Sequence, residues 1–305
     1  MTRSTLRRCS FPAAMALLAL TVAAAGADAD ALPPVDAIPA SVLTPDRHGD
    51  PTVTALWSAS VEAELARDPE RSAALRRQIL ALRPGDIHTG WRLARDLMLI
   101  GESLPEDDVA ARLPVFEEAR AVSTRAFELD PRCPECCFYR FASISRVATT
   151  RGALRSMGLV REAGRQLTTC LAMPPPTWSD ADWNHEQANL YYGAAVYYRM
   201  LPDNWWAQNL LGLRGDRREA ARWARRAVEV SPDRLDYRVE LGIALVCVGE
   251  AFGDGAARRE GLEWLADVDQ LPDRMDTDPV DRNRAEEVRL EPGSACGNAR
   301  ALKVE

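Results

Sequence analysis

The 305-residue sequence has little of what several function classes require. It contains one lysine, Lys303, and three histidines, His48, His88 and His185. It also lacks the H-E-x-x-H metal motif, a Gly-rich phosphate loop and the G-x-S-x-G nucleophile motif. Scattered histidines without such motifs are typical of surface positions. We therefore expect no enzyme activity, no metal site and no cofactor.

The first 27 residues are typical of a secretory signal peptide. Three arginines precede an apolar run from Phe11 to Ala25, and small residues follow it. We expect the mature chain to begin near Asp28 and to be exported to the periplasm, although an uncleaved signal acting as a short anchor stays open. A bacterial lipid anchor would need a cysteine just after the apolar run. Because Cys9 lies before that run, we expect no lipid anchor.

Acidic residues outnumber basic ones, with 45 Asp and Glu against 38 Lys and Arg. The signal peptide carries three arginines and no acid, so its removal takes the net charge from −7 to near −10. This charge argues against nucleic acid as a partner, because phosphate binding relies on clustered cations. After the signal there is no run of 18 apolar residues, so we expect a soluble mature chain.

The rest of the sequence predicts an all-α chain. Apolar residues recur at helical spacing within segments that are separated by Pro, Gly and Asp residues. The alternation of apolar and polar residues that is typical of strands is scarce. Residues 28–51 are rich in proline and predict an extended leader. A helical domain is expected over residues 52–290, followed by a tail over residues 291–305.

A spacing of small residues repeats along this domain. Two small residues lie seven apart and a proline follows five later, at Ala119, Ala126 and Pro131, at Ala163, Cys170 and Pro175, and at Ala220, Ala227 and Pro232. The stretches after Pro84 and Pro232 share a second pattern, a Leu, a small residue, a Leu and a Gly at the same offsets. These patterns resemble the tetratricopeptide repeat (TPR), a helical hairpin with small residues where its helices cross. The resemblance implies an α-solenoid of about four or five stacked hairpins.

One of these hairpins carries an insertion near residues 200–214. A helix predicted over "ANLYYGAAVYYR" and a second over "DRREAARWARRAVEV" are separated by far more than the usual short turn. The insertion holds Trp205 and Trp206 behind a Pro-Asp-Asn turn signal. Insertions of this kind project on one face of a solenoid, so either ring could be buried or could contact a ligand or neighbouring subunit.

The "CPECC" stretch places Cys133, Cys136 and Cys137 close together near a predicted helix start. The residues alone leave redox, haem and zinc roles open, but each role lacks a required partner or context. In an exported chain a disulfide is favoured, with Cys170 as the expected distant partner. Cys247 is expected to be a buried thiol.

Tyr192, Tyr198 and Arg151 complete the candidate contacts. The paired tyrosines of "NLYYGAAVYYR" lie partly on the buried stripe of their helix and partly outside it, so core packing and ligand contact both stay open. Arg151 precedes a glycine and could turn its guanidinium toward a solenoid channel, or remain solvated.

Three stretches, "CCFYRFASISRVATTRGALRS", "NLYYGAAVYYR" and "LPDNWWAQNLLGLRGDRREA", are similar in this order to the T-components of tripartite ATP-independent periplasmic (TRAP) transporters. The similarity covers roughly residues 110–250. It implies a periplasmic repeat protein that can form a homotrimer, has a channel lined by apolar groups and partners a solute-binding protein. Two alternative functions therefore stay open. The first is an accessory for uptake of a small, apolar organic solute, and the second is a general TPR scaffold that binds other polypeptides.

Overall fold

The computed structural model describes residues 49–105, 107–173, 181–204, 208–209, 212–213, 215–273 and 278–298. Over these ranges the chain consists of helices and their connections, without a strand. This confirms the predicted all-α class. The expected signal peptide and most of the expected leader lie outside the described residues.

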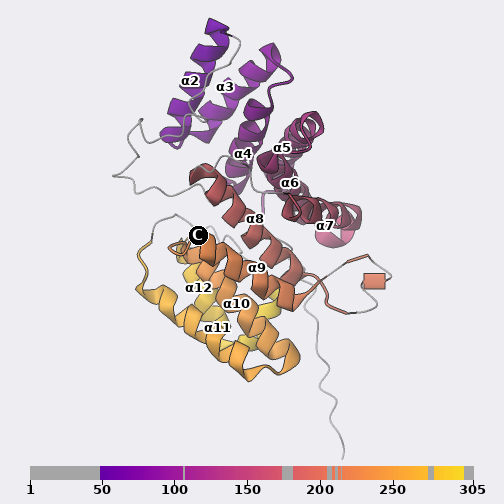
Figure 1. Ribbon diagram of the computed structural model, residues 1–305, viewed down its shortest axis with the longest axis vertical. Coiled ribbons are helices and arrows are strands. Elements are labelled where there is room, and N and C mark those ends of the chain that lie inside the picture. The colour runs from indigo at the N-terminus through magenta and orange to yellow at the C-terminus, as the bar shows by residue number, and fades with distance from the viewer. Residues whose placement is uncertain are drawn as a thin grey trace, which may run out of the picture.

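Successive helices pack against one another in pairs. The pairs are α2 (Pro51–Leu65) with α3 (Pro69–Leu82), α4 (Ile87–Ser103) with α5 (Val109–Leu129), α6 (Pro134–Arg151) with α7 (Met157–Leu171), α8 (Ala181–Met200) with α9 (Arg217–Val230), and α10 (Leu235–Phe252) with α11 (Gly255–Asp267). Short 3-10 helices precede α7 (η2, Ala153–Ser156) and follow α11 (η4, Val268–Gln270). Figure 1 shows the pairs following one another along the long axis of the molecule. The chain is therefore an α-solenoid of helical hairpins, as predicted.

Aspartates fix where many of these helices begin. Each of them accepts a hydrogen bond from a backbone N–H in the first turn of the helix that follows, at Asp50, Asp68, Asp86, Asp108, Asp216 and Asp254. An acidic N-cap accepts hydrogen bonds from backbone N–H groups that have no partner within the helix. Its negative charge also interacts favourably with the positive end of the helix dipole. The local sequence therefore marks where these helices begin.

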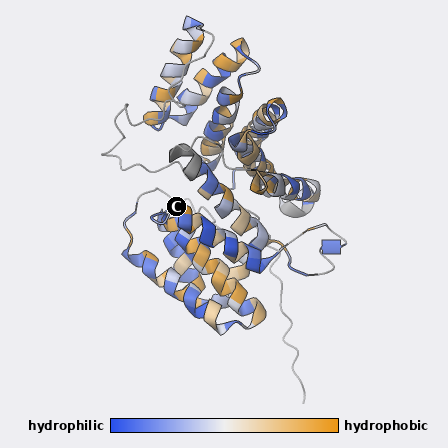
Figure 2. Cartoon of the chain, in the orientation of Figure 1, coloured by the Kyte–Doolittle hydropathy of each residue, from blue (hydrophilic) through white to orange (hydrophobic). Residues whose placement is uncertain are grey.

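Small residues allow the paired helices to approach closely. The repeat positions Ala119, Ala126, Ala163, Ala220 and Ala227 are all at most 2% exposed. They lie on α5, α7 and α9, the second helices of three hairpins. Small side chains at a crossing let neighbouring helices interdigitate at short distance, which is the reason for their regular spacing. Figure 2 shows hydrophobic and hydrophilic residues interspersed along the helices.

The C-terminal end is packed more extensively than an isolated tail would be. Helix α12 (Asp278–Leu290) and the 3-10 helix η5 (Pro292–Gly297) both contact α10. Ala295 is fully buried in a cluster with Val239, Ile243 and Val288. The packed body therefore extends beyond Leu290 to at least the end of η5. Among the described helices, none is both long and apolar enough to cross a membrane.

Candidate functional site

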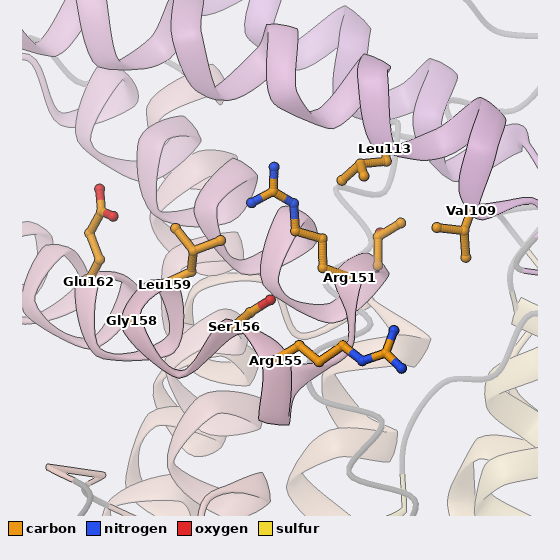
Figure 3. A pocket seen from close by; sticks show the side chains of 9 residues that line it. Val109, Leu113, Arg151, Arg155, Ser156, Gly158, Leu159 and Glu162 are labelled. Atoms are coloured by element: carbon orange, nitrogen blue, oxygen red, sulfur yellow. The ribbon is translucent and has the colours of Figure 1, made fainter.

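A pocket of about 810 Å³ lies where α5, α6 and α7 meet. Its lining residues are Val109, Leu113, Thr150, Arg151, Arg155, Ser156, Gly158, Leu159 and Glu162. Figure 3 shows Val109 and Leu113 facing the pocket from α5, with Arg151 between α5 and the start of α7. The lining of this open hollow combines three apolar side chains, those of Val109, Leu113 and Leu159, with five polar ones.

The turn between α6 and α7 builds the polar side of the pocket. Helix α6 ends at Arg151, and its C-cap residue Gly152 has a φ of 90°, in a region that residues with a Cβ rarely adopt. The chain then forms η2 and enters α7 at Ser156. Because of this tight reversal, Arg151 at the end of α6 and the η2 residues Arg155 and Ser156 line the same pocket.

Charges around the pocket are compensated except at one position. Arg151 forms an ion pair with Glu117, in which both side chains are more than 40% exposed. Glu162 accepts hydrogen bonds from Arg120 at 3.0 and 3.3 Å. Within the described part of the chain, the guanidinium of Arg155 forms no hydrogen bond or ion pair. The pocket therefore carries one uncompensated positive charge.

Arg151 is the candidate contact from the sequence that reaches this pocket. Tyr192 is 1% exposed and packs against Tyr237, with ring centroids 5.5 Å apart, so it lies in the core. Tyr198 is partly buried and its ring meets that of Tyr197 edge to face. The sequence therefore placed Arg151, Tyr192 and Tyr198 in one set of candidate contacts, whereas the structure separates them.

The insertion is closed at its base by backbone hydrogen bonds. The Gly215 N–H donates to the Pro202 carbonyl at 3.3 Å, and the Asp216 N–H donates to the Tyr198 carbonyl at 3.0 Å. Leu201 and Leu213 are at most 2% exposed, so both ends of the insertion are docked in the main core. Trp205 and Trp206, which lie between them in sequence, fall outside the described residues.

Six cysteines form three disulfides. Cys133 pairs with Cys136, Cys137 pairs with Cys170, and Cys247 pairs with Cys296. The expectation that Cys247 is a free buried thiol was wrong. Because η5 folds back onto α10, the Cα atoms of Cys247 and Cys296 come within 4.8 Å, a separation that a disulfide spans.

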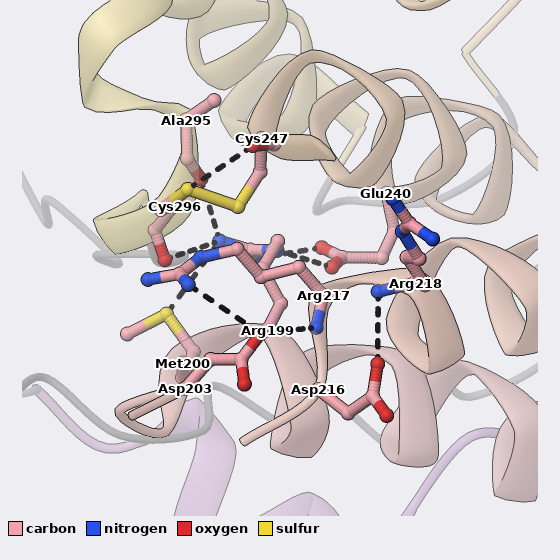
Figure 4. The surroundings of a disulfide bond; sticks show 10 residues. All are labelled: Arg199, Met200, Asp203, Asp216, Arg217, Arg218, Glu240, Cys247, Ala295 and Cys296. Atoms are coloured by element: carbon pink, nitrogen blue, oxygen red, sulfur yellow. Dashed lines mark hydrogen bonds and ion pairs between the residues drawn. A yellow bond between two sulfur atoms is a disulfide. The ribbon is translucent and has the colours of Figure 1, made fainter. Parts of the chain in front are cut away.

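A buried ionic network surrounds this last disulfide (Figure 4). Arg199 of α8 donates two hydrogen bonds to Glu240 of α10, at 2.7 and 3.1 Å, and both side chains have no exposed surface. Arg199 also donates to the carbonyls of Ala295 at 2.8 Å and Cys296 at 3.3 Å. The network therefore ties α8, α10 and η5 together, and sequence reasoning did not find it.

A second ionic network links α2, α3 and α4. Arg76 of α3 donates to Asp96 of α4 at 2.5 Å and also pairs with Glu64 of α2. Burial would raise the pKa of Glu64, but the nearby guanidinium groups of Arg95, Arg76 and Arg92 hold it well below its usual range. Burial raises the pKa of Asp96 despite its contact with Arg76. The network stabilises the N-terminal hairpins and lies away from the pocket residues.

Aromatic and polar side chains connect the first helices of successive hairpins. Trp91 of α4 stacks on Tyr139 of α6 with ring centroids 5.9 Å apart, and the Tyr139 hydroxyl donates to Glu186 of α8 at 2.7 Å. Similarly, the Tyr237 hydroxyl of α10 donates to Asn189 of α8 at 2.7 Å. Burial, followed by the Glu186 carboxylate, raises the pKa of Tyr139. These neutral hydroxyls hold the hairpins in register.

Within the described ranges, no group of three or more His, Cys, Asp or Glu side chains is arranged to hold a metal ion. The pocket beside Arg151 is an open hollow whose volume lies in the range of small-molecule sites. No protein-family model matches the chain, and no curated protein matches it.

Proposed function

We propose that this chain is a non-enzymatic, exported helical-repeat protein that assists TRAP-type uptake of a small organic solute by partnering a periplasmic solute-binding protein. The observation that carries the proposal is the pocket of about 810 Å³ between α5, α6 and α7. It offers Val109, Leu113 and Leu159 to a hydrocarbon group and Arg151 to a polar one. A solute could therefore be held without any catalytic group taking part.

The disulfides support the exported location. Three pairs link six cysteines, and two of them join segments 33 and 49 residues apart in sequence. Disulfides persist in oxidising compartments such as the bacterial periplasm and are rare in the cytosol. Stacked hairpins also supply the extended surfaces that repeat proteins use to bind polypeptides.

The proposal is tested by capture from a periplasmic extract with the purified full-length protein as bait. Mass spectrometry of the captured proteins is expected to identify a TRAP-type solute-binding protein, and native mass spectrometry of the bait is expected to show a bound small molecule. Capture of other polypeptides by a bait without any small molecule would instead support the general TPR scaffold.

A further inference from the structure

We propose that the Cys133–Cys136 disulfide at the start of α6 is a thiol–disulfide exchange site, which accepts two electrons from an external dithiol. This chemistry is separate from the proposed binding of a solute and does not depend on it. The support comes from the position of the two sulfurs at a helix start, from their unequal exposure and from the contrast with the neighbouring disulfide.

The two cysteines lie at the first turn of a long helix. Cys133 is the N-cap residue of α6, which has 18 residues, and Cys136 follows three residues later. The Cys136 N–H donates a hydrogen bond to the Cys133 sulfur at 3.1 Å. This donor and the positive end of the helix dipole stabilise negative charge on the Cys133 sulfur once the disulfide is open. Because stabilising the reduced form makes a disulfide a stronger oxidant, this position favours electron uptake.

Glu135 lies beside the same sulfur. Its side chain is buried, and one of its carboxylate oxygens is 3.7 Å from the Cys133 sulfur. When the disulfide is open, this oxygen accepts a hydrogen bond from the Cys133 thiol, whereas its negative charge opposes the thiolate. The Cys133 sulfur therefore has one neighbour suited to each of its two protonation states, and thiol–disulfide exchange passes through both.

Exposure decides which sulfur an external thiolate can attack. Cys133 is 9% exposed, whereas Cys136 has no exposed surface. The turn before Cys133 is open to solvent, because Pro131 and Arg132 are both exposed. The rate of exchange depends on access and on which sulfur is attacked. An incoming thiolate therefore attacks the Cys133 sulfur, and Cys136 is the leaving group.

The Cys137–Cys170 disulfide, which begins one residue later, has a contrasting arrangement. It joins α6 to α7, and its cysteines are 0% and 4% exposed. The Gln166 side chain donates to both sulfurs, at 3.0 Å to Cys137 and 3.8 Å to Cys170. Cys133–Cys136 instead joins two residues at the start of one helix, so opening it leaves α6 and α7 linked. The first disulfide can therefore change its redox state while the hairpin stays closed.

The exchange is balanced by a dithiol donor. One thiolate of the donor attacks the Cys133 sulfur, forms a mixed disulfide and releases Cys136 as a thiolate. The second thiolate of the donor then attacks the donor sulfur of the mixed disulfide and releases Cys133 as a thiolate. The donor loses two electrons and becomes a disulfide, Cys133 and Cys136 gain these electrons, and the two protons of the donor thiols pass to the cysteines through solvent.

The first experiment treats the full-length oxidised protein with dithiothreitol, or with reduced thioredoxin, at pH 7 without denaturant. Free thiols are alkylated at intervals and mapped by mass spectrometry. Cys133 and Cys136 are expected to be labelled about tenfold faster than the cysteines of the other two disulfides, while the circular dichroism spectrum stays helical. Reduction by dithiothreitol alone would identify a small dithiol as the donor, and reduction by both reagents would show that a polypeptide dithiol also reaches Cys133.

Single-serine variants test which sulfur reacts. Cys136→Ser leaves the Cys133 thiol at the N-cap, and Cys133→Ser leaves the Cys136 thiol without exposed surface. Because serine is itself a favoured N-cap residue, Cys133→Ser should still start α6 normally. With oxidised glutathione, Cys136→Ser is expected to form a mixed disulfide about tenfold faster than Cys133→Ser. Thermal unfolding shows whether both variants are folded.

Two results would overturn the inference. If Cys137–Cys170 or Cys247–Cys296 is reduced as fast as Cys133–Cys136, or if all three resist both reductants until the protein unfolds, the first disulfide is only structural. Equal reactivity of the two folded serine variants toward oxidised glutathione would reject the attack at Cys133. The reduction experiment uses the wild-type protein, so it decides the question even if a serine variant does not fold.

Discussion

Arg199 and Glu240 form a two-point ion pair although neither side chain has any exposed surface. Glu240 also accepts a hydrogen bond from Arg284 of α12 at 3.1 Å. Because Arg284 also pairs with the buried Asp281, two carboxylates balance two buried guanidinium groups from different helices. Burying such charges is costly unless every partner is present, so the C-terminal hairpin depends on the complete set.

Removing the charge of Glu240 should strongly destabilise the protein. Glu240→Gln leaves Arg199 and Arg284 buried with less negative charge, and we expect a loss of about 3–5 kcal/mol in the free energy of unfolding, measured with urea. Glu260→Gln is the matched control, because the Arg225–Glu260 pair has side chains 45% and 42% exposed and should contribute less than about 1 kcal/mol. Equal losses in the two variants would contradict the buried network.

Glu64 should make the N-terminal hairpins sensitive to acid. Its folded pKa lies below the unfolded value of about 4.3, so the native state binds fewer protons at this group than the unfolded state. Its stabilising contribution is therefore full above about pH 4.3 and is lost as the pH falls through the folded pKa. The raised pKa of Asp96 acts in the opposite direction; burial, its first cause, remains in a Glu64 variant, whereas the contribution of the Glu64 charge is lost.

The test compares the wild-type protein with Glu64→Gln by urea unfolding between pH 7 and pH 3. The variant should be less stable at pH 7, and the difference should shrink below about pH 4, because Glu64 is then protonated in the unfolded state while it stays charged in the folded wild-type protein. Glu118→Gln, which removes a 39% exposed partner of Arg77, serves as the control and should show a small difference throughout. A large difference that stays constant over this range would rule out the role assigned to Glu64.

The three disulfides should differ in what they contribute to stability. In the chain-entropy model the contribution grows with the length of the closed loop, and the loops span 49 residues for Cys247–Cys296 and 3 for Cys133–Cys136. Replacing both cysteines by alanine should cost about 4 kcal/mol for the long loop and about 2 kcal/mol for the short one. Calorimetry under non-reducing conditions measures both, and a reversed order would contradict the loop-length explanation.

The sequence predicted the hairpins because their signals are local. A small residue such as Ala220 or Ala227 marks a crossing through its spacing alone, and an aspartate such as Asp216 marks a helix start within three residues. Arg199 and Glu240 are 41 residues apart, and their pairing depends on how two hairpins stack. A pattern that shows which residues share a helix face cannot show which charged residues meet across helices.

The pocket was only partly predictable for the same reason. Arg151 drew notice because a glycine follows it, and that glycine does form the turn beside the pocket. Ser156 and Arg155 gave no separate signal, because a serine and an arginine near a helix start are common in any helical protein. Their significance depends on Leu113 of α5, which the fold brings to the same pocket from more than 40 residues earlier.

The base of the insertion should tolerate no side chain at Gly215. A Cβ atom there would lie 2.2 Å from the Leu201 carbonyl oxygen and 2.7 Å from that of Pro202, so backbone would have to move. We expect Gly215→Ala to cost about 1–3 kcal/mol, as overpacking of a tight contact does. The hydrogen bond from the Asp216 N–H to Tyr198 should open more often, and this amide should exchange faster with solvent.

Gly255→Ala provides the comparison for Gly215→Ala, because the closest atom to its added Cβ would be the end of the Arg259 side chain at 3.6 Å. Its stability should change by no more than about 0.5 kcal/mol. Urea unfolding and hydrogen exchange of the two variants separate the cost of a lost glycine from the cost of opening the insertion. If both alanine variants unfold alike and the Asp216 amide stays protected in each, the base of the insertion does not hold the two hairpin helices together. If the Asp216 amide exchanges faster only in Gly215→Ala, the contacts of residues 201–202 with residues 215–216 keep the base of the insertion closed.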